Sequence, residues 1–276
     1  MRANLHTTSK HLPRVPAHGN NVVRSPILAD LPAFMSDCAI RYHNVHKQLD
    51  GAAVLRGIDL AIRPGELFGL AGINGAGKTT LLHCLFDFCT PDAGEIAIFG
   101  QAHARSAARA PLSFLPERFQ APYYLSGQDF LRYVLGLQQV RWNGDAVRAI
   151  LDALELAPQA LQRQARSYSK GMMQKLGLAA CLLSGKRQLV LDEPMSGLDP
   201  KARALFKLAL RQLRAQGRGA FLTSHALADI DELCDRMAIL HAGKMVFVGT
   251  PEECRQRHGG GPQASLEQAF LNCIAA

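Results

Sequence analysis

The chain lacks the features that would mark a secreted or membrane-spanning protein. Its seven cysteines are odd in number and form no CxxC pair, which argues against both a disulfide framework and a zinc site. No apolar run approaches the roughly 18 to 20 residues that cross a bilayer, and residues 1–30 lack the apolar centre of a secretory signal. We therefore expect a protein of a reducing, cytosolic compartment that does not itself enter the membrane.

The sequence also has no run of lysine or arginine on the scale of a nucleic-acid-binding arm, although its formal net charge is +8. Residues 1–34 hold four basic residues and one acidic residue, or +3, which leaves +5 for the remainder. That moderate excess is typical of a solvated surface and is compatible with a place near anionic lipid headgroups. We expect no specific nucleic-acid partner.

The two ends of the chain differ in pattern from the middle. Residues 1–34 contain four prolines and no helical or strand periodicity, which predicts a disordered N-terminal extension. Met35 follows, and translation from Met35 is a hypothesis that the intact mass of natively expressed protein would test. Three glycines at 259–261 predict a flexible joint before a last short helix, within a C-terminal helical tail at 251–276.

Between these ends, the hydrophobic pattern predicts an α/β domain over 35–250. AIRYHNVHK and VLRGIDLAI alternate as antiparallel strands around the turn Asp50-Gly51. From residue 67 onward, short apolar strands alternate with helical patterns, which is the rhythm of an α/β sheet. Strand patterns disappear between about residues 116 and 184, so we expect a helical subdomain there.

GINGAGKT, residues 72–79, fits the pattern G-x-x-x-x-G-K-[ST]. It follows a predicted strand and opens a predicted helix, a context that favours phosphate binding over a glycine-rich turn without a ligand. Glycines leave backbone N–H groups uncovered for the β- and γ-phosphates, Lys78 adds a mobile positive charge, and the Thr79 hydroxyl can ligate Mg²⁺. The candidate nucleotide-binding residues are Gly72, Asn74, Gly75, Ala76, Gly77, Lys78, Thr79 and Thr80.

Two acidic residues follow the apolar strand at 189–191. Asp192 is placed to hold Mg²⁺ through water, and Glu193 is a natural general base for an attacking water. An acidic pair at a helix N-terminus is the alternative interpretation, which the phosphate loop outweighs. His225 follows another strand and could hold the water in line, although a lone histidine is more often structural. Glu193, His225 and Lys78 are the candidate catalytic residues.

The stretch SYSKGMMQKLG, residues 167–177, predicts a helix whose first turn is unfavourably charged. Ser169 is a good N-cap, but Lys170 and Gly171 follow it, where the helix dipole disfavours a cation and a glycine weakens the turn. Both residues make sense if this helix end and the Ser169 hydroxyl face an anionic ligand.

These motifs, together with SGLD at 196–199, occur in the order of an ATP-binding cassette (ABC) nucleotide-binding domain, which residues 36–250 resemble. The resemblance implies an α/β phosphate-loop NTPase core with an antiparallel β subdomain and a helical signature subdomain. It implies hydrolysis of ATP with Mg²⁺ between two cassettes, as a homodimer or with a paired cassette. The signature residues Ser169, Lys170, Gly171 and Met172 would then face the partner's ATP, and Asp199 would lie at the dimer seam.

Two departures from the family pattern point to a subgroup. The signature is YSKGM at 168–172, where L-S-G-G-Q is commonest, and Glu117 takes the place of the usual glutamine in SFLPERF. Both variants are similar to those of cassettes that serve ABC-2-type exporters. Glu117 is therefore a candidate coupling residue and a weaker candidate metal ligand.

A third departure concerns adenine, on which family members often stack an aromatic side chain. Leu49 stands at the expected position, and Tyr42 or His46 are the possible substitutes. If neither serves, the base has only apolar contacts, and we expect weaker discrimination among nucleotides.

The resemblance implies a transporter ATPase at the cytoplasmic face of the inner or plasma membrane, with export as the direction and separate membrane-spanning permease subunits as partners. Phe119, Pro122, Tyr123 and Tyr124 suit a permease interface, although a buried loop anchor is nearly as good an interpretation. The rival class is a soluble ABC ATPase that acts on nucleic acid or ribosomes. Such proteins usually carry a coiled-coil, zinc or second-cassette insertion, none of which the sequence shows.

Overall fold

The structure is a computed structural model that describes residues 37–260 and 264–275. The predicted extension at 1–34 and the start at Met35 lie outside the described residues. Among the residues that are described, no helix combines the length and the apolar character that a bilayer crossing needs.

The first part of the described chain builds an antiparallel sheet. Its strands lie in the order β2-β1-β4-β5. The predicted turn joins the first two strands, and its residues Asp50 and Gly51 have φ angles of 50° and 79°, the left-handed pair that suits a two-residue hairpin. The strands are β1 (Ile40–Leu49), β2 (Ala52–Ile62), β4 (Ala93–Ile98) and β5 (Gln101–Ala102).

A six-stranded sheet forms the core, in the order β10-β9-β3-β8-β7-β6. Neighbouring strands run parallel except β10, which pairs antiparallel with β9 through a turn at Ala242-Gly243. Three of the parallel strands, those at 67–71, 188–191 and 219–224, are buried along their whole length because both faces of the sheet are covered. The strands are β3 (Leu67–Ala71), β6 (Leu112–Leu115), β7 (Gln188–Leu191), β8 (Gly219–Ser224), β9 (Arg236–His241) and β10 (Lys244–Gly249).

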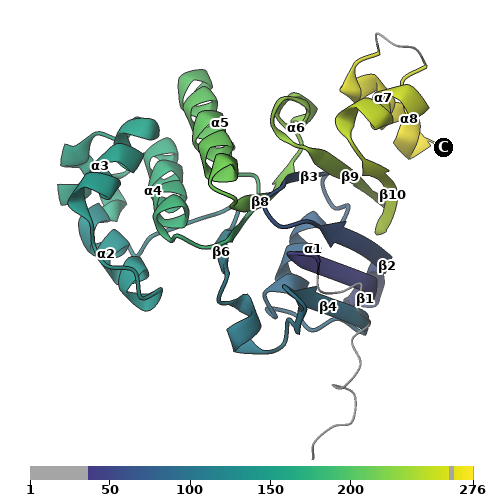
Figure 1. Ribbon diagram of the computed structural model, residues 1–276, viewed down its shortest axis with the longest axis horizontal. Helices are drawn as coiled ribbons and strands as arrows, with labels where there is room; N and C mark the ends of the chain where they lie inside the picture. The colour runs from purple at the N-terminus through teal and green to yellow at the C-terminus, as the bar shows by residue number, and fades with distance from the viewer. Residues whose placement is uncertain (1–36, 261–263, 276) are drawn as a thin grey trace, which may run out of the picture. The chain divides into compact units, whose positions relative to one another are not determined.

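The two faces of this sheet bury different clusters, because successive side chains of a strand point to opposite faces. From β3, Phe68 and Leu70 join the cluster beneath the antiparallel sheet and helix α1 (Lys78–Leu85). Leu67 and Ala71 join the opposite cluster, under α5 (Pro200–Ala215) and α6 (Leu227–Leu233). Figure 1 shows α5 and α6 on one side of the core strands and α1 with the antiparallel strands on the other.

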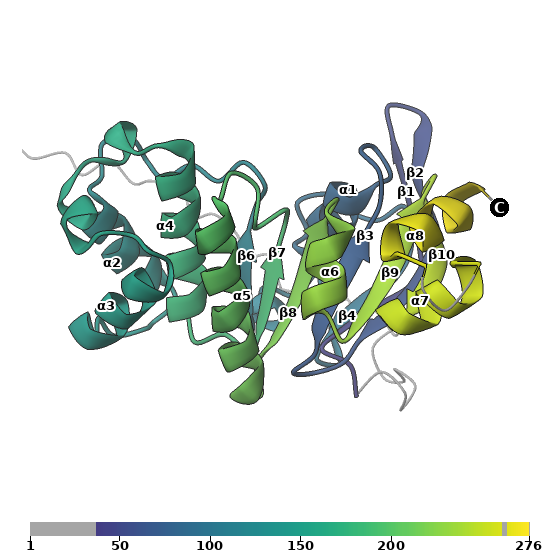
Figure 2. The ribbon, with the colours of Figure 1, turned by 90° about the horizontal axis from the view of Figure 1, so that it is seen from above.

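A group of helices lies between β6 and β7 in sequence and beside α5 in space (Figure 2). Its helix α4 begins at the predicted cap, where the Ser169 hydroxyl accepts the N–H of Met172. The expected subdomain at 116–184 contains these helices, and its limits stay a prediction. The helices are α2 (Gly127–Leu137), α3 (Gly144–Ala153) and α4 (Lys170–Leu183), with single 3-10 turns at Pro158–Gln162 and Ala165–Ser167; another such turn is Ser106–Arg109.

Two helices close the described chain, α7 (Pro251–His258) and α8 (Leu266–Ala275). The sequence did not predict α7 as a separate helix, because PEECRQRH has no apolar stripe. Its start is instead fixed by a capping box, in which Thr250 accepts the N–H of Glu253 and the Glu253 carboxylate accepts the N–H of Thr250.

Candidate active site

The glycine-rich loop at 72–79 joins the end of β3 to the start of α1. Gly75 and Gly77 have φ angles of 79° and 109°, which side chains with a Cβ adopt only at a steric cost. A Cβ placed on Gly75 would meet nothing within 4 Å, so this part of the loop is open to a ligand. Gly77 precedes α1 without a capping side chain, and the first turn of α1 has no acidic residue. The first N–H groups of α1 therefore suit an anion.

Lys78 is buried in this loop, and its ammonium lies against the backbone. Its Nζ donates to the carbonyl of Gly72 at 2.7 Å and to that of Ile73 at 3.4 Å. The nearest charge is Glu193, whose Oε1 lies 3.9 Å from Nζ. A phosphate in the loop would meet this positive charge directly, so Lys78 and the loop N–H groups fit a polyphosphate.

Thr79 and Asp192 bring a hydroxyl and a carboxylate together across the groove. Thr79 Oγ1 donates to Asp192 Oδ2 at 3.0 Å, and Asp192 is almost fully buried at the end of β7. Oxygen atoms of these two kinds are ligands that Mg²⁺ prefers. The pair fits a Mg²⁺ ion that also contacts the phosphates.

Glu193 leaves the strand in a left-handed conformation, with a φ angle of 48°. This turn brings its carboxylate to His225, whose Nδ1 lies 2.8 Å from Oε2. The backbone N–H of His225 approaches the same oxygen at 3.4 Å, while its imidazole is largely exposed. The carboxylate thus lies between an imidazole and the Lys78 ammonium, where it could take a proton from a water in the groove.

One groove of about 770 Å³ contains most of the predicted residues. It brings together residues of α1 and of the loops that follow β3, β6, β7 and β8, which are far apart in the sequence. Gly72 does not line the groove but holds Lys78 through its carbonyl. The lining residues are Leu49, Val54, Ile73, Asn74, Gly75, Ala76, Gly77, Lys78, Thr79, Thr80, Glu117, Arg118, Asp192, Glu193 and His225.

Thr223 is a site residue that the sequence analysis did not predict. It is the fifth residue of the buried strand GAFLTS, and its hydroxyl contacts both Asp192 and the backbone of Glu193. The only signal in the sequence was a pair of hydroxyl side chains, Thr223 and Ser224, between the apolar part of the strand and His225.

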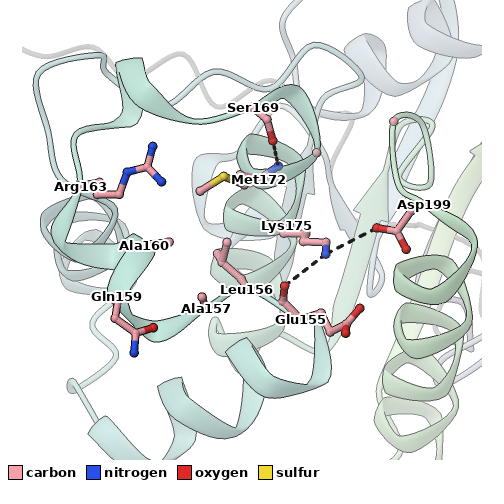
Figure 3. Close-up of a pocket in the computed structure, with 12 residues that line it drawn as sticks. Glu155, Leu156, Ala157, Gln159, Ala160, Arg163, Ser169, Met172, Lys175 and Asp199 are labelled. Atoms are coloured by element: carbon pink, nitrogen blue, oxygen red, sulfur yellow. Dashed lines mark hydrogen bonds and ion pairs between the residues drawn. The ribbon is translucent and has the colours of Figure 1, made fainter.

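The structure places three of the four signature residues on a different pocket, of about 430 Å³, at the start of α4 (Figure 3). Ser169, Gly171 and Met172 line this pocket with Asp199. Lys175 connects the two sides of this pocket. The Lys175 Nζ donates to the carbonyl of Glu155 at 3.2 Å and lies 3.8 Å from Asp199 Oδ2. None of these residues lines the groove that contains the phosphate loop of the same chain.

Asp199 is the N-cap of α5. Its Oδ1 accepts the N–H of Ala202 at 2.9 Å. This hydrogen bond lowers the pKa of the Asp199 carboxyl, and the charge of Lys175 lowers it further. Asp199 is therefore ionised near neutral pH and presents a negative charge beside the signature helix.

Gly171 and Lys170 pack against the loop before α5. A Cβ on Gly171 would lie 3.1 Å from the carbonyl oxygen of Gly197, so a larger residue there would crowd the backbone. The Lys170 side chain lies over Gly197 and lines a third cavity, of about 530 Å³. Glu117 lines both this cavity and the phosphate groove. Glu117 thus lies between the phosphate groove and the cavity that Lys170 lines.

The adenine side of the groove corrects one prediction. Tyr42 cannot stack on a base, because it is fully buried and its hydroxyl donates to the carbonyl of Leu81 at 3.4 Å. His46 bonds to Asn44 Oδ1 at 3.0 Å and is not among the residues that line the groove. Leu49 lines the groove beside Val54 and is 42% exposed.

The core sheet, the glycine-rich loop and the acidic strand end define an α/β nucleotide-binding protein of the phosphate-loop class. The "ABC transporter" family model matches residues 55–196. The chain belongs to the ABC transporter family, and the predicted fold class is confirmed.

Three relatives illustrate this membership. An uncharacterized ABC transporter ATP-binding protein of Nostoc sp. is 38% identical over 72% of this chain, which spans only 60% of the length of that relative. The Nod factor export ATP-binding protein I of Rhizobium sp. strain N33 is 35% identical over 83% of this chain and 79% of the relative. A solved ATP-binding subunit of an ABC transporter superposes with a TM-score of 0.78, at 26% identity over 85% of this chain and 99% of that chain.

We expect the substitution Leu49→Tyr to tighten ATP binding by about 2- to 10-fold, because ring stacking adds roughly 0.5–1.5 kcal/mol beyond area burial. The wild-type chain should bind ATP and GTP with similar affinities, since Leu49 offers only apolar contact. Calorimetric titration with each nucleotide measures both effects. Leu208→Tyr, at an exposed leucine of α5, is the matched control. Equal ATP affinities of the wild type and Leu49→Tyr would contradict the placement of adenine at Leu49.

Proposed function

We propose that this chain is the ATP-hydrolysing subunit of an ABC exporter whose membrane-spanning permease subunits are separate chains. The observation that carries the proposal is the single groove in which the phosphate loop, Asp192, Glu193 and His225 meet. Export is supported by the Nod factor export relative and by the YSKGM and SFLPERF variants.

In this proposal the β- and γ-phosphates bind to the loop N–H groups and to Lys78, which turns from the loop carbonyls to the phosphate oxygens. Thr79 and Asp192 would hold Mg²⁺, which would neutralise charge on the phosphate oxygens. Glu193 accepts a proton from the attacking water while the oxygen of that water bonds to the γ-phosphorus. The bond from the γ-phosphorus to the bridging oxygen breaks, and that oxygen leaves with ADP. His225 orients the water and the γ-phosphate.

A second cassette completes each site. Ser169, Lys170, Gly171 and Met172 begin a helix whose N-terminal N–H groups suit an anion, yet this helix end faces its own pocket. Two copies arranged head to tail would bring each signature to the partner's phosphate groove. Asp199, ionised at the rim of the same pocket, would then lie at the seam between the copies.

The permease contact is proposed on the loop that follows Glu117, at the cytoplasmic face of the membrane. Tyr123 and Tyr124 are 69% and 63% exposed and support an interface. Phe119 packs on Phe130, with ring centroids 5.5 Å apart, and anchors the loop. Glu117 would couple this contact to the groove.

Purification of the tagged chain from detergent-solubilised membranes tests the proposal. We expect a polytopic protein to co-purify and the complex to hydrolyse ATP in a Mg²⁺-dependent manner. Tyr123→Ser/Tyr124→Ser should lose the polytopic protein and keep nucleotide binding. Recovery of DNA or ribosomes without a membrane protein would refute the exporter assignment.

A further inference from the structure

Thr223 is held at the meeting point of the two acidic residues of the site. It lies in β8 next to β7, it is 0% exposed, and every residue of the strand is buried. Its Oγ1 donates to Asp192 Oδ1 at 2.6 Å and accepts the backbone N–H of Glu193 at 2.9 Å. A hydroxyl has one donor hydrogen, and here that hydrogen and an acceptor lone pair are both used within the site.

The bond that Thr223 accepts fixes the backbone turn at Glu193. The N–H of Asp192 still continues the parallel ladder, since it donates to the carbonyl of Leu115 at 2.8 Å. The next N–H, that of Glu193, points instead to Thr223, and the φ angle changes to 48°. Left-handed backbone is sterically unfavourable for glutamate, so a bond to a buried partner helps to hold it. This turn directs the carboxylate toward His225.

The bond that Thr223 donates fixes the carboxylate of Asp192. Oδ1 accepts from Thr223 and Oδ2 accepts from Thr79, so the plane of the carboxylate is held between two hydroxyls. Oδ2 is thereby presented to the Thr79 side of the groove, where the proposed Mg²⁺ would bind. Partners that orient a metal-binding carboxylate commonly affect both metal affinity and rate.

We infer that Thr223 is a positioning residue. Its one hydroxyl fixes the orientation of the Asp192 carboxylate, which would bind the metal, and the direction of the Glu193 carboxylate, which would act as the base. The inference rests on the proposed ATP hydrolysis for its role in the reaction. Valine has nearly the shape of threonine but neither donor nor acceptor, and serine keeps both. These two substitutions therefore separate the hydroxyl from the volume of the side chain.

In Thr223→Val we expect kcat for ATP to fall by about 10- to 100-fold, with little change in KM, because partners of this kind typically have effects of that size. Mg²⁺ should tighten the binding of a non-hydrolysable ATP analogue to the wild type, and this tightening should be smaller in Thr223→Val by a similar factor. Binding of the analogue without Mg²⁺ should stay unchanged. Thr223→Ser should restore both. Thr250→Val is the matched control, because Thr250 also accepts a backbone N–H but caps α7 outside the groove.

Amide hydrogen exchange of Glu193 in the nucleotide-free protein gives a readout that needs no activity. Thr223→Val should speed this exchange and Thr223→Ser should preserve its protection. Unchanged exchange, wild-type kcat and wild-type Mg²⁺ dependence in Thr223→Val would overturn the inference, as would a serine variant as impaired as the valine variant. A wild-type chain without ATPase activity would refute the proposed function, whereas the exchange and Mg²⁺-binding experiments would still decide the role of Thr223.

Discussion

Glu193→Gln should lower the steady-state rate of ATP hydrolysis by about 100- to 10,000-fold, the usual contribution of a general base. Glutamine keeps the size of the side chain and can still bond to His225, but it cannot accept the proton of the attacking water. ATP binding should persist, because Lys78 and the loop N–H groups are unchanged. Phosphate release and nucleotide affinity, measured on the same preparation, separate the two effects.

Glu66→Gln provides the matched control for this substitution. Glu66 is also a buried carboxylate, but it pairs with Arg236 Nη1 at 3.3 Å and does not line the groove. Its loss should reduce stability and leave the rate per folded molecule near that of the wild type. If Glu193→Gln hydrolysed ATP at the wild-type rate, another group would have to be the base.

Lys78→Ala should weaken ATP binding by about 30- to 1,000-fold, which corresponds to about 2–4 kcal/mol for the loss of charge-assisted contacts to phosphate. The substitution removes the ammonium from a buried position and leaves the carbonyls of Gly72 and Ile73 without their donor. Titration with a fluorescent ATP analogue measures the effect.

Lys47→Ala controls for the loss of a lysine that bonds to a backbone carbonyl. Lys47 donates to the carbonyl of Thr90 at 2.8 Å, much as Lys78 donates to that of Gly72, but it does not line the groove. ATP affinity should stay at the wild-type value in Lys47→Ala. Equal affinities of Lys78→Ala and the wild type would show that the nucleotide binds elsewhere.

The parts of the site that could be predicted from sequence are those set by local backbone geometry. The loop at 72–79 has its glycines, lysine and threonine at fixed spacing, so its pattern and its flanking strand and helix identify it. Asp192 and Glu193 could be placed because the carboxyl ends of parallel strands meet at one edge of a sheet.

The parts that could not be predicted depend on contacts between distant segments. Thr223 lies 31 and 30 residues from its partners Asp192 and Glu193, and only the pairing of β7 with β8 brings them together. Tyr42 was a candidate for stacking because aromatic residues suit adenine, but the side of β1 on which it lies packs against α1. The sequence explained the glycine at position 171 only by a nearby anion. In the structure the carbonyl of Gly197 also lies too close for a larger side chain at this position.

If two copies of this chain enclose ATP, as proposed, the mass of Glu193→Gln in solution should depend on nucleotide. One chain weighs 30.0 kDa. Light scattering after size-exclusion chromatography should give this mass without nucleotide and twice this mass with ATP and Mg²⁺. Adding Gly171→Val, which crowds Gly197 at the signature, should prevent the doubling. A variant that binds ATP and Mg²⁺ at saturation and keeps the mass of one chain would contradict the enclosure of ATP by two copies.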